Sequence, residues 1–260
     1  MRVGGLAHSF GELRVIDRID LEAEPGEVVG IVGRSGCGKT TLLELVAGLR
    51  APDQGSVSVL GHSDPAERLE RCAYMPQSDL LLPWLSAVDN AALALRIAGI
   101  SRGEARKRAG ADFDRLGLAG FEGTRPGQLS GGMRQRVAFL RTLMAGRPVL
   151  LLDEPFASLD AITRAEMQSW LAGVLGQSSS DSSASRLGPP RHTVLLVTHD
   201  VEEALYLADR VLVLGSRPSR VADRIDVESP RAFDRAAAVT APEFAELKER
   251  AIRSLMEAAR

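Results

Sequence analysis

The sequence predicts an α/β fold built on a mainly parallel sheet with helices on both faces. Its strongest strand signals, such as "EVVGIVG" (27–33) and "TVLLV" (193–197), are apolar throughout and do not alternate with polar residues. Stretches with helical periodicity separate these strands. Strands that are buried on both faces, and that alternate with helices, are typical of a parallel sheet.

Each element follows from its own pattern. Residues 13–23 alternate as a half-buried strand does, and 27–33 run into glycine as a buried strand. Residues 39–49 predict a buried helix, because apolar side chains cover most of its circumference. Residues 84–147 are expected to be mainly helical. Further strands are expected at 55–61, 71–77, 149–152, 193–197 and 211–214.

Composition excludes several classes of protein. The chain has 260 residues, 45% of them hydrophobic and 25% charged, with a net charge of −2. That balance argues against a nucleic-acid partner bound through bulk positive charge. Two cysteines are too few for a disulfide framework and suit a reducing cytosol. The longest apolar runs fall far short of the roughly 20 residues of a membrane helix.

Two segments differ from the rest. Residues 176–190, "GQSSSDSSASRLGPP", offer almost nothing to bury, so we expect a flexible surface insertion there. A role such as phosphorylation remains an alternative to a plain linker. From residue 229 onward the periodicity predicts a helical tail that docks on the rest of the chain.

The stretch "GRSGCGKT" (33–40) matches the phosphate-loop pattern G-x-x-x-x-G-K-[ST], between a predicted strand and a predicted helix. Its glycines let successive backbone N–H groups converge on phosphate oxygens at a helix N-terminus. Lys39 is expected to reach the β- and γ-phosphates, and the Thr40 hydroxyl to bind Mg²⁺. A glycine-rich turn that matches by chance is the alternative. The candidate nucleotide-binding residues are Gly33, Arg34, Ser35, Gly36, Cys37, Gly38, Lys39, Thr40 and Thr41.

Two adjacent carboxylates end the apolar strand in "VLLLDEP" (149–155). Asp153 fits the residue that holds Mg²⁺, and Glu154 fits the base that polarises an attacking water. Two solvent-exposed acids at a strand end are the alternative. The phosphate loop elsewhere in the chain favours the catalytic interpretation.

A second glycine-containing helix start lies in "LSGGMRQRVAFLRTLMAG" (129–146). Ser130 is a candidate N-cap, and Gly131 and Gly132 leave backbone N–H groups uncovered. Three arginines lie off the apolar stripe of this helix. They form either a solvated basic face or part of a second anion site: Arg134, Arg136 and Arg141.

His199 follows another apolar strand in "VTHDVEEAL" (197–205). At the carboxyl edge of a parallel sheet, a contact to the γ-phosphate is the favoured interpretation, with a structural histidine as the alternative. Asp200 and Glu203 resemble a capping box for the next helix. The other histidines show no spacing that suggests metal binding.

Taken together, these motifs resemble the ATP-binding subunit of ABC transporters over roughly residues 1–215. "LSGGMRQR" is similar to the family's signature sequence, and "SLD" (158–160) to its D-loop, which places Asp160 at the nucleotide. Gln77 in "YMPQ" matches the Q-loop glutamine, a catalytic and Mg²⁺-binding position. Phe10 occupies the place of the aromatic side chain that stacks on adenine. Lys39, Glu154 and His199 complete the catalytic set that the resemblance implies.

The resemblance also implies a fold: a P-loop NTPase (RecA-like) core with a mainly parallel sheet, an N-terminal antiparallel β portion and a helical subdomain. Residues 1–76 and 148–228 would form the core, 77–147 the helical subdomain and 229–260 the tail. Ser130, Gly131 and Gly132 of one subunit would close on ATP held by a second one, in a homodimer or a heterodimer. The pair would dock on an integral membrane permease at the cytoplasmic face of the membrane.

Within the family, "MPQSDLLLPWLSAVDN" is similar to importers of nitrate, taurine, alkanesulfonates and related solutes, which an external solute-binding protein delivers. We expect Leu82, Trp84 and Leu85 to divide between internal packing and a surface for the permease. Plain core is the alternative for this stretch. Rival functions are an exporter or lipoprotein-release ATPase, a non-transport ABC ATPase, and a P-loop kinase of a small metabolite.

Overall fold

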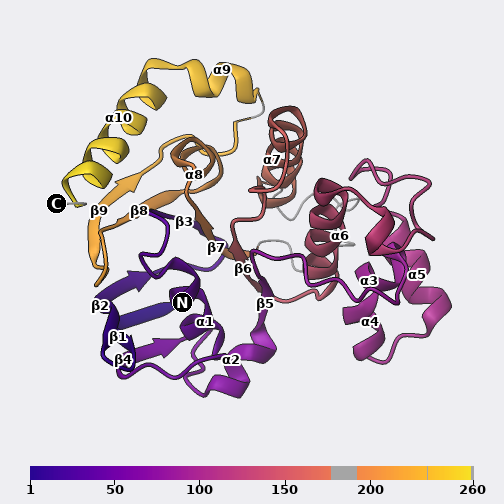
Figure 1. Ribbon diagram of the computed structural model, residues 1–260. Helices are drawn as coiled ribbons and strands as arrows, with labels where there is room; N and C mark the ends of the chain where they lie inside the picture. Colours follow the sequence, from indigo (N-terminus) through magenta and orange to yellow (C-terminus); the bar gives the residue numbers. More distant parts are fainter. Residues whose placement is uncertain (177–191, 233, 259–260) are drawn as a thin grey trace.

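The computed structural model describes residues 1–176, 192–232 and 234–258 (Figure 1). The serine-rich stretch expected at 176–190 therefore lies, apart from its first residue, outside the described residues. No helix among the described residues is long and apolar enough to cross a membrane.

A three-stranded antiparallel sheet forms the N-terminal part of the fold, with strand order β2–β1–β4. Its strands are β1 (Arg2–Phe10), β2 (Leu13–Glu22) and β4 (Gln54–Ser58). The sequence patterns indicated β2 and β4 but not β1, whose Gly4–Gly5 pair interrupts the alternation. The antiparallel N-terminal β portion of the expected fold is confirmed.

The second sheet has six strands in the order β5–β6–β7–β3–β8–β9, and the first five are parallel. The edge strand β9 runs antiparallel to β8 and was not predicted, because its sequence "VADRID" is mostly polar. The mainly parallel sheet is confirmed. Its strands are β5 (Cys72–Met75), β6 (Val149–Asp153), β7 (Thr193–Thr198), β3 (Val28–Gly33), β8 (Arg210–Leu214) and β9 (Val221–Asp226).

Both faces of this sheet are buried, as the apolar runs predicted. In β3, Val28 and Val32 join one hydrophobic core, whereas Val29 and Ile31 join another. Neighbouring strands divide in the same way. The first core packs against α6, α7 and α8, and the second against α1 and the N-terminal sheet. Covered faces explain why these strands carry no alternating polar residues.

Helices account for most of the remaining described chain. The stretch 71–77 was expected to be one strand, but Arg71 ends the helix α2, which the Asp64 side chain caps, and β5 spans only four residues. Between β5 and β6 the described chain is helix and loop, as predicted. The helices are α1 (Lys39–Ala47), α2 (Pro65–Arg71), α3 (Ala87–Ala91), α4 (Leu93–Ile97), α5 (Arg102–Gly110), α6 (Gly131–Met144), α7 (Ala161–Gly176), α8 (Val201–Leu207), α9 (Arg235–Thr240) and α10 (Pro242–Glu257).

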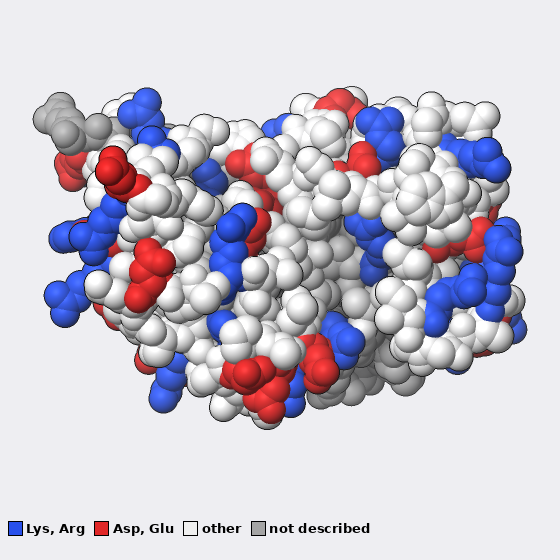
Figure 2. All heavy atoms as spheres, turned by 60° about the horizontal axis from the view of Figure 1, so that its bottom comes forward, with Lys and Arg blue, Asp and Glu red and all other residues white. Residues whose placement is uncertain are grey.

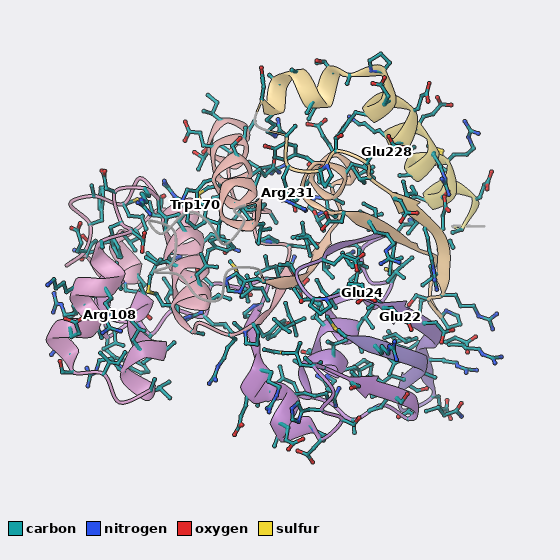
Figure 3. All side chains as sticks on the ribbon, turned by 180° about the vertical axis from the view of Figure 1, so that it is seen from behind. Glu22, Glu24, Arg108, Trp170, Glu228 and Arg231 are labelled. Carbon is teal, nitrogen blue, oxygen red and sulfur yellow. The ribbon has the colours of Figure 1, made fainter. Side chains whose placement is uncertain are left out.

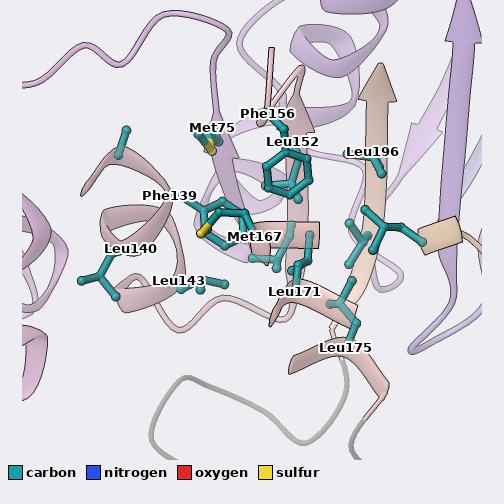
Figure 4. Close-up of a cluster of buried hydrophobic side chains, with 14 of the residues drawn as sticks. Met75, Phe139, Leu140, Leu143, Leu152, Phe156, Met167, Leu171, Leu175 and Leu196 are labelled. Carbon is teal, nitrogen blue, oxygen red and sulfur yellow. The ribbon is translucent and has the colours of Figure 1, made fainter. Parts of the chain in front are cut away.

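The helices α3 to α6 gather at one side of the parallel sheet (Figure 1). Aromatic packing joins them to the core. Phe139 of α6 is 1% exposed, and its ring centroid lies 6.2 Å from that of Phe156 and 5.5 Å from that of Trp170 on α7. Met75, Leu152, Met167 and Leu171 surround this contact (Figure 4).

The C-terminal helices α9 and α10 lie against α8 and β9 (Figure 1). Arg231 (Figure 3) donates its backbone N–H to the Tyr206 carbonyl at 2.7 Å, and its side chain donates to the Leu207 carbonyl at 2.6 Å. Arg250 of α10 pairs with Asp223 of β9 at 2.7 Å. The tail is thus held by charged and backbone contacts as well as by apolar packing.

Acidic and basic side chains are interspersed on the face shown in Figure 2. Neither sign of charge forms a single broad patch on this face.

Candidate functional site

The loop between β3 and α1 has the geometry that its glycines require. Gly38 has a φ of 105°, and a Cβ there would lie 2.8 Å from Val15 Cγ1. At Gly33 a Cβ would lie 2.8 Å from Cys37 Sγ. Gly36 also has a positive φ, of 77°. Glycine therefore follows this path with less strain than a residue with a side chain would.

The predicted nucleotide-binding residues surround the N-terminus of α1. Arg34, Ser35, Gly36 and Thr40 are exposed, whereas Gly33, Cys37, Lys39 and Thr41 are buried and Gly38 is half-buried. Lys39 donates from Nζ to the Gly33 carbonyl at 2.8 Å and to the Arg34 carbonyl at 3.2 Å. Its ammonium group is thus held inside the loop that precedes its own helix. Burial raises the pKa of the Cys37 thiol, so this side chain is a neutral packing group.

Asp153 ends β6 and Glu154 follows it, at the same edge of the sheet as this loop. The Thr40 hydroxyl donates to Asp153 Oδ2 at 2.7 Å. Asp153 is 1% exposed, and this burial raises the pKa of its carboxyl group, although the Thr40 bond and Lys39 oppose the rise. The Thr40 hydroxyl and the Asp153 carboxylate are oxygen ligands of the kind that Mg²⁺ prefers.

Glu154 is the point where the predicted residues meet. Its Oε2 accepts a hydrogen bond from Gln77 Nε2 at 3.2 Å and lies 3.1 Å from His199 Nδ1, and its Oε1 lies 4.0 Å from Lys39 Nζ. The backbone at Glu154 has a φ of 48°, a strained value for a residue with a side chain. Its N–H donates to the Val197 carbonyl at 2.8 Å, which holds this conformation. Three chain segments thus converge on one carboxylate.

Asp200, next to His199, caps α8 by accepting from the N–H groups of Glu202 and Glu203 at 2.9 and 3.2 Å. The predicted capping box is wrong for its second contact, the one from the Glu203 side chain back to the cap residue. The Glu203 side chain does not return to the cap but is buried, where it accepts from Gln168 Nε2 at 3.0 Å. Packing of α8 against α7 draws it inward.

Ser130 caps α6 as predicted, with its Oγ accepting from the Met133 N–H at 3.2 Å. Gly131 is exposed and Gly132 half-buried. No hydrogen bond or ion pair among the described residues joins this helix start to Lys39 or Glu154. Within one chain, the two predicted phosphate sites are therefore separate.

Of the two alternatives for the arginines of α6, a solvated basic face does not hold, because these side chains bind neighbouring segments. Arg134 donates to Asp79 Oδ2 at 2.9 Å, and Arg136 to the Leu116 carbonyl at 2.8 Å. Arg141 donates to the Leu80 carbonyl at 2.8 Å and to the Asp79 carbonyl at 2.7 Å. These bonds fix the segment after Gln77 on α6.

Phe10 and Asp160 lie at two other parts of the surface. The Phe10 ring is 42% exposed, and the Arg50 guanidinium lies 5.0 Å from its centroid. Asp160 Oδ1 accepts from the Thr163 N–H at 3.0 Å, and hydrogen bonds from Thr163 lower the pKa of its carboxyl group. Asp160 thus caps the first turn of α7, a contact that the sequence motif did not indicate.

The apolar stretch after Gln77 divides between the interior and the surface. Leu82 and Leu85 are half-buried, whereas Trp84 is 68% exposed. Two neighbours were not singled out from the sequence: Leu81 is buried and Leu80 is 63% exposed. Trp84 and Leu80 together present apolar surface to solvent.

Comparison with known proteins gives one family. The family model described as ABC transporter matches residues 16–157. The formylaminopyrimidine import ATP-binding protein ThiZ of Halalkalibacterium halodurans is 43% identical over 78% of this chain and 74% of its own. The taurine import ATP-binding protein TauB of Chromobacterium violaceum is 42% identical over 90% of this chain and 86% of its own. The aliphatic sulfonates import ATP-binding protein SsuB of Cupriavidus pinatubonensis is 42% identical over 94% of this chain and 73% of its own.

A solved structure supports the same fold. The dimeric, post-hydrolysis ATP-binding cassette MJ0796, bound to ADP and Pi, superposes with a TM-score of 0.74 at 27% identity. The match covers 88% of this chain and 99% of that one.

Proposed function

The chain belongs to the ABC transporter family and is the ATP-binding and hydrolysing subunit of an importer. We propose that the solute of this importer is taurine, an aliphatic sulfonate, nitrate or a similar small molecule. Two relatives named for taurine and sulfonate import, at 42% identity, support this class. The "LPW" sequence at 82–84 supports it as well. A relative of equal identity is named for formylaminopyrimidine import, so identity alone does not separate these solutes.

The observation that carries the proposed chemistry is the convergence on Glu154. Glu154 would orient the attacking water and accept its proton, while Gln77 and His199 hold the carboxylate from two other segments. Lys39 would bind the β- and γ-phosphate oxygens and offset their charge. The residues from Gly33 to Thr41 would direct backbone N–H groups at the phosphates, and Phe10 would stack on the adenine ring.

The site fits Mg²⁺. Thr40 and Asp153 would hold the ion, because their oxygens already lie 2.7 Å apart at the end of the phosphate loop. Gln77 would add its amide oxygen, since its amide nitrogen faces Glu154. When bound, Mg²⁺ would neutralise phosphate charge and orient the terminal phosphate.

The second phosphate site supports a dimer. The start of α6 presents backbone N–H groups that no side chain covers, at Ser130, Gly131 and Gly132. Within the described residues, these groups make no hydrogen bond to the phosphate loop of the same chain. We propose that they close on ATP held by a second copy or by a related subunit, with Asp160 at the same boundary. The dimeric form of the solved cassette is consistent with this arrangement.

The exposed apolar surface of Leu80 and Trp84 would receive a cytoplasmic segment of an integral membrane permease. That contact would place the dimer at the cytoplasmic face of the membrane, and an external binding protein would deliver the solute. Arg141 fixes the carbonyl of Leu80 to α6, so the surface is held rigidly beside the signature helix. Large aromatic side chains at interfaces supply much of the binding energy.

The test of the catalytic proposal is Glu154→Gln, a change that keeps the shape of the side chain. ATP binding should be unchanged while hydrolysis falls by about 10²- to 10⁴-fold. Glu166→Gln, on the exposed face of α7, is the matched control and should hydrolyse ATP normally. Normal turnover in Glu154→Gln would refute the assignment of the base. ATP consumption that requires a phosphate acceptor would instead indicate a kinase.

The partner proposal has its own test. In membranes that contain a candidate permease, Trp84→Ala should weaken association of the ATPase while leaving its ATP affinity intact. An equal loss of permease association and ATP affinity would show that Trp84 has a structural role. Reconstitution with a candidate permease and binding protein, followed by stimulation of hydrolysis with candidate solutes, would identify the solute.

A further inference from the structure

Arg164 lies in the first turn of α7, between two segments that the proposed function places at the nucleotide. Its Nη2 donates to the Leu159 carbonyl at 3.1 Å, and its Nη1 lies 3.7 Å from Asp200 Oδ2. Leu159 directly precedes Asp160, and Asp200 directly follows His199. One guanidinium group therefore connects the turn at 157–160 with the loop that holds His199.

Each of these partners is itself tied to a functional segment. Leu159 is 5% exposed, and its Cδ2 lies 3.1 Å from where a Cβ on Gly132 would stand, so it packs on the start of α6. The Asp200 backbone N–H donates to the Thr198 hydroxyl oxygen at 3.0 Å, and the Asp200 side chain caps α8. Any displacement of Asp200 must move His199, because the two residues are adjacent in the chain.

The contacts of Arg164 are not explained by stability alone. The ion pair with Asp200 is about one-third exposed on both sides, and such pairs contribute little to folding. The Nε atom of Arg164 is buried and has no hydrogen-bond partner within the described part of the chain. An unpaired buried donor is unfavourable. The two terminal nitrogens of Arg164 thus make one contact on each side, and its charge also acts on buried Glu203. Lysine has a single terminal nitrogen and lacks the planar fork that makes both contacts together.

We propose that Arg164 is a positioning residue that couples the turn at 157–160, and through Leu159 the start of α6, to the placement of His199 against Glu154. This inference rests on the proposed function, since it concerns how the same site is assembled. In a closed dimer, a shift of the turn at 157–160 reaches His199 through the Arg164 guanidinium. The residue acts on hydrolysis without touching ATP.

The first test is a comparison of Arg164→Ala with Arg164→Lys. We expect Arg164→Ala to lower kcat by about 3- to 30-fold, the size of a typical coupling effect, with ATP affinity and melting temperature close to wild type. Arg164→Lys keeps the charge but cannot make both contacts, so it should recover only part of kcat. Arg108→Ala removes a comparable surface ion pair, with Glu104 at 2.7 Å, and should leave kcat unchanged (Figure 3).

The second test is a double-mutant cycle with Asp200→Asn, a change that preserves the helix cap and removes the charge. If the two residues act through one contact, Arg164→Ala with Asp200→Asn together should lose no more kcat than Arg164→Ala alone. Additive losses, or unchanged kcat in Arg164→Ala, would overturn the coupling. Equal losses of stability, binding and kcat would reduce Arg164 to a folding role. If the wild-type chain does not hydrolyse ATP, the proposed function itself is refuted. A wild-type chain that hydrolyses ATP leaves the test of Arg164 as a test of the coupling alone.

Discussion

Two adjacent glutamates of α8 should give opposite pH dependences of stability. Glu203 is 3% exposed, and burial raises the pKa of its carboxyl group from the ordinary 4.5 to about 7. Glu202 lies at the surface of the same turn, where it pairs with Lys248 at 3.0 Å and Arg235 at 2.9 Å. Burial tends to raise the pKa of Glu202, but the bonds from these cations outweigh it and lower the pKa.

The magnitude for Glu203 follows from its shift. Between pH 4.5 and about 7 the folded chain binds more protons at this group than the unfolded chain does. The free energy of unfolding therefore falls as pH rises through that window and is constant above it. A rise of the pKa from 4.5 to about 7 corresponds to about 3 kcal/mol of lost stability at pH 8. Glu203→Gln removes this loss and retains an acceptor for Gln168.

The assay is urea unfolding of wild type and Glu203→Gln across this pH range, because the difference between the two cancels all shared titrations. The variant should gain stability relative to wild type as pH rises, by about 3 kcal/mol at the alkaline end. Glu202→Gln is the control with the opposite sign: it should be less stable than wild type at neutral pH, and the deficit should vanish as pH falls through the folded-state pKa of Glu202. A pH-independent difference for Glu203→Gln would refute the reasoning.

Two further changes test the packing and the phosphate loop. Phe139→Ala should lower the free energy of unfolding by about 3–5 kcal/mol in urea titrations, because it empties the contact between α6, Phe156 and Trp170, and Phe139→Leu should lose less. If Phe139→Ala lost less free energy of unfolding than Phe139→Leu, the packing described for Phe139 would be contradicted. Gly38→Ala should lower ATP affinity more than Gly36→Ala in an equilibrium binding assay. Both glycines have a positive φ, but only at Gly38 would the new Cβ also clash with Val15. Equal effects would show that the backbone conformation alone matters.

Much of the candidate site could be predicted because its residues end apolar strands. Asp153 ends β6, His199 follows β7 and the phosphate loop follows β3. The carboxyl ends of neighbouring parallel strands meet at one edge of a sheet, so proximity followed once the strands were recognised. Their order in the sheet was not needed for that inference.

Other features could not be predicted, since they depend on long-range folding. The bonds from Arg141 to 79–80 join residues about sixty positions apart, and nothing in the helical pattern of α6 indicates them. Glu203 has the spacing of a capping box, yet packing against Gln168 outweighs that local preference. The strands β1 and β9 escaped detection because a glycine pair interrupts one and polar residues fill the other.

The position of β3 in the sheet has a consequence for synthesis of the chain. This strand is translated early, but its two neighbours, β7 and β8, span residues 193–214. Until the ribosome has released most of the protein, the backbone N–H and C=O groups along both edges of β3 have no native partner. Contacts of such large sequence separation form slowly and leave hydrophobic strands exposed. The phosphate loop, whose path depends on this strand, is therefore among the last features of the molecule to take its final form.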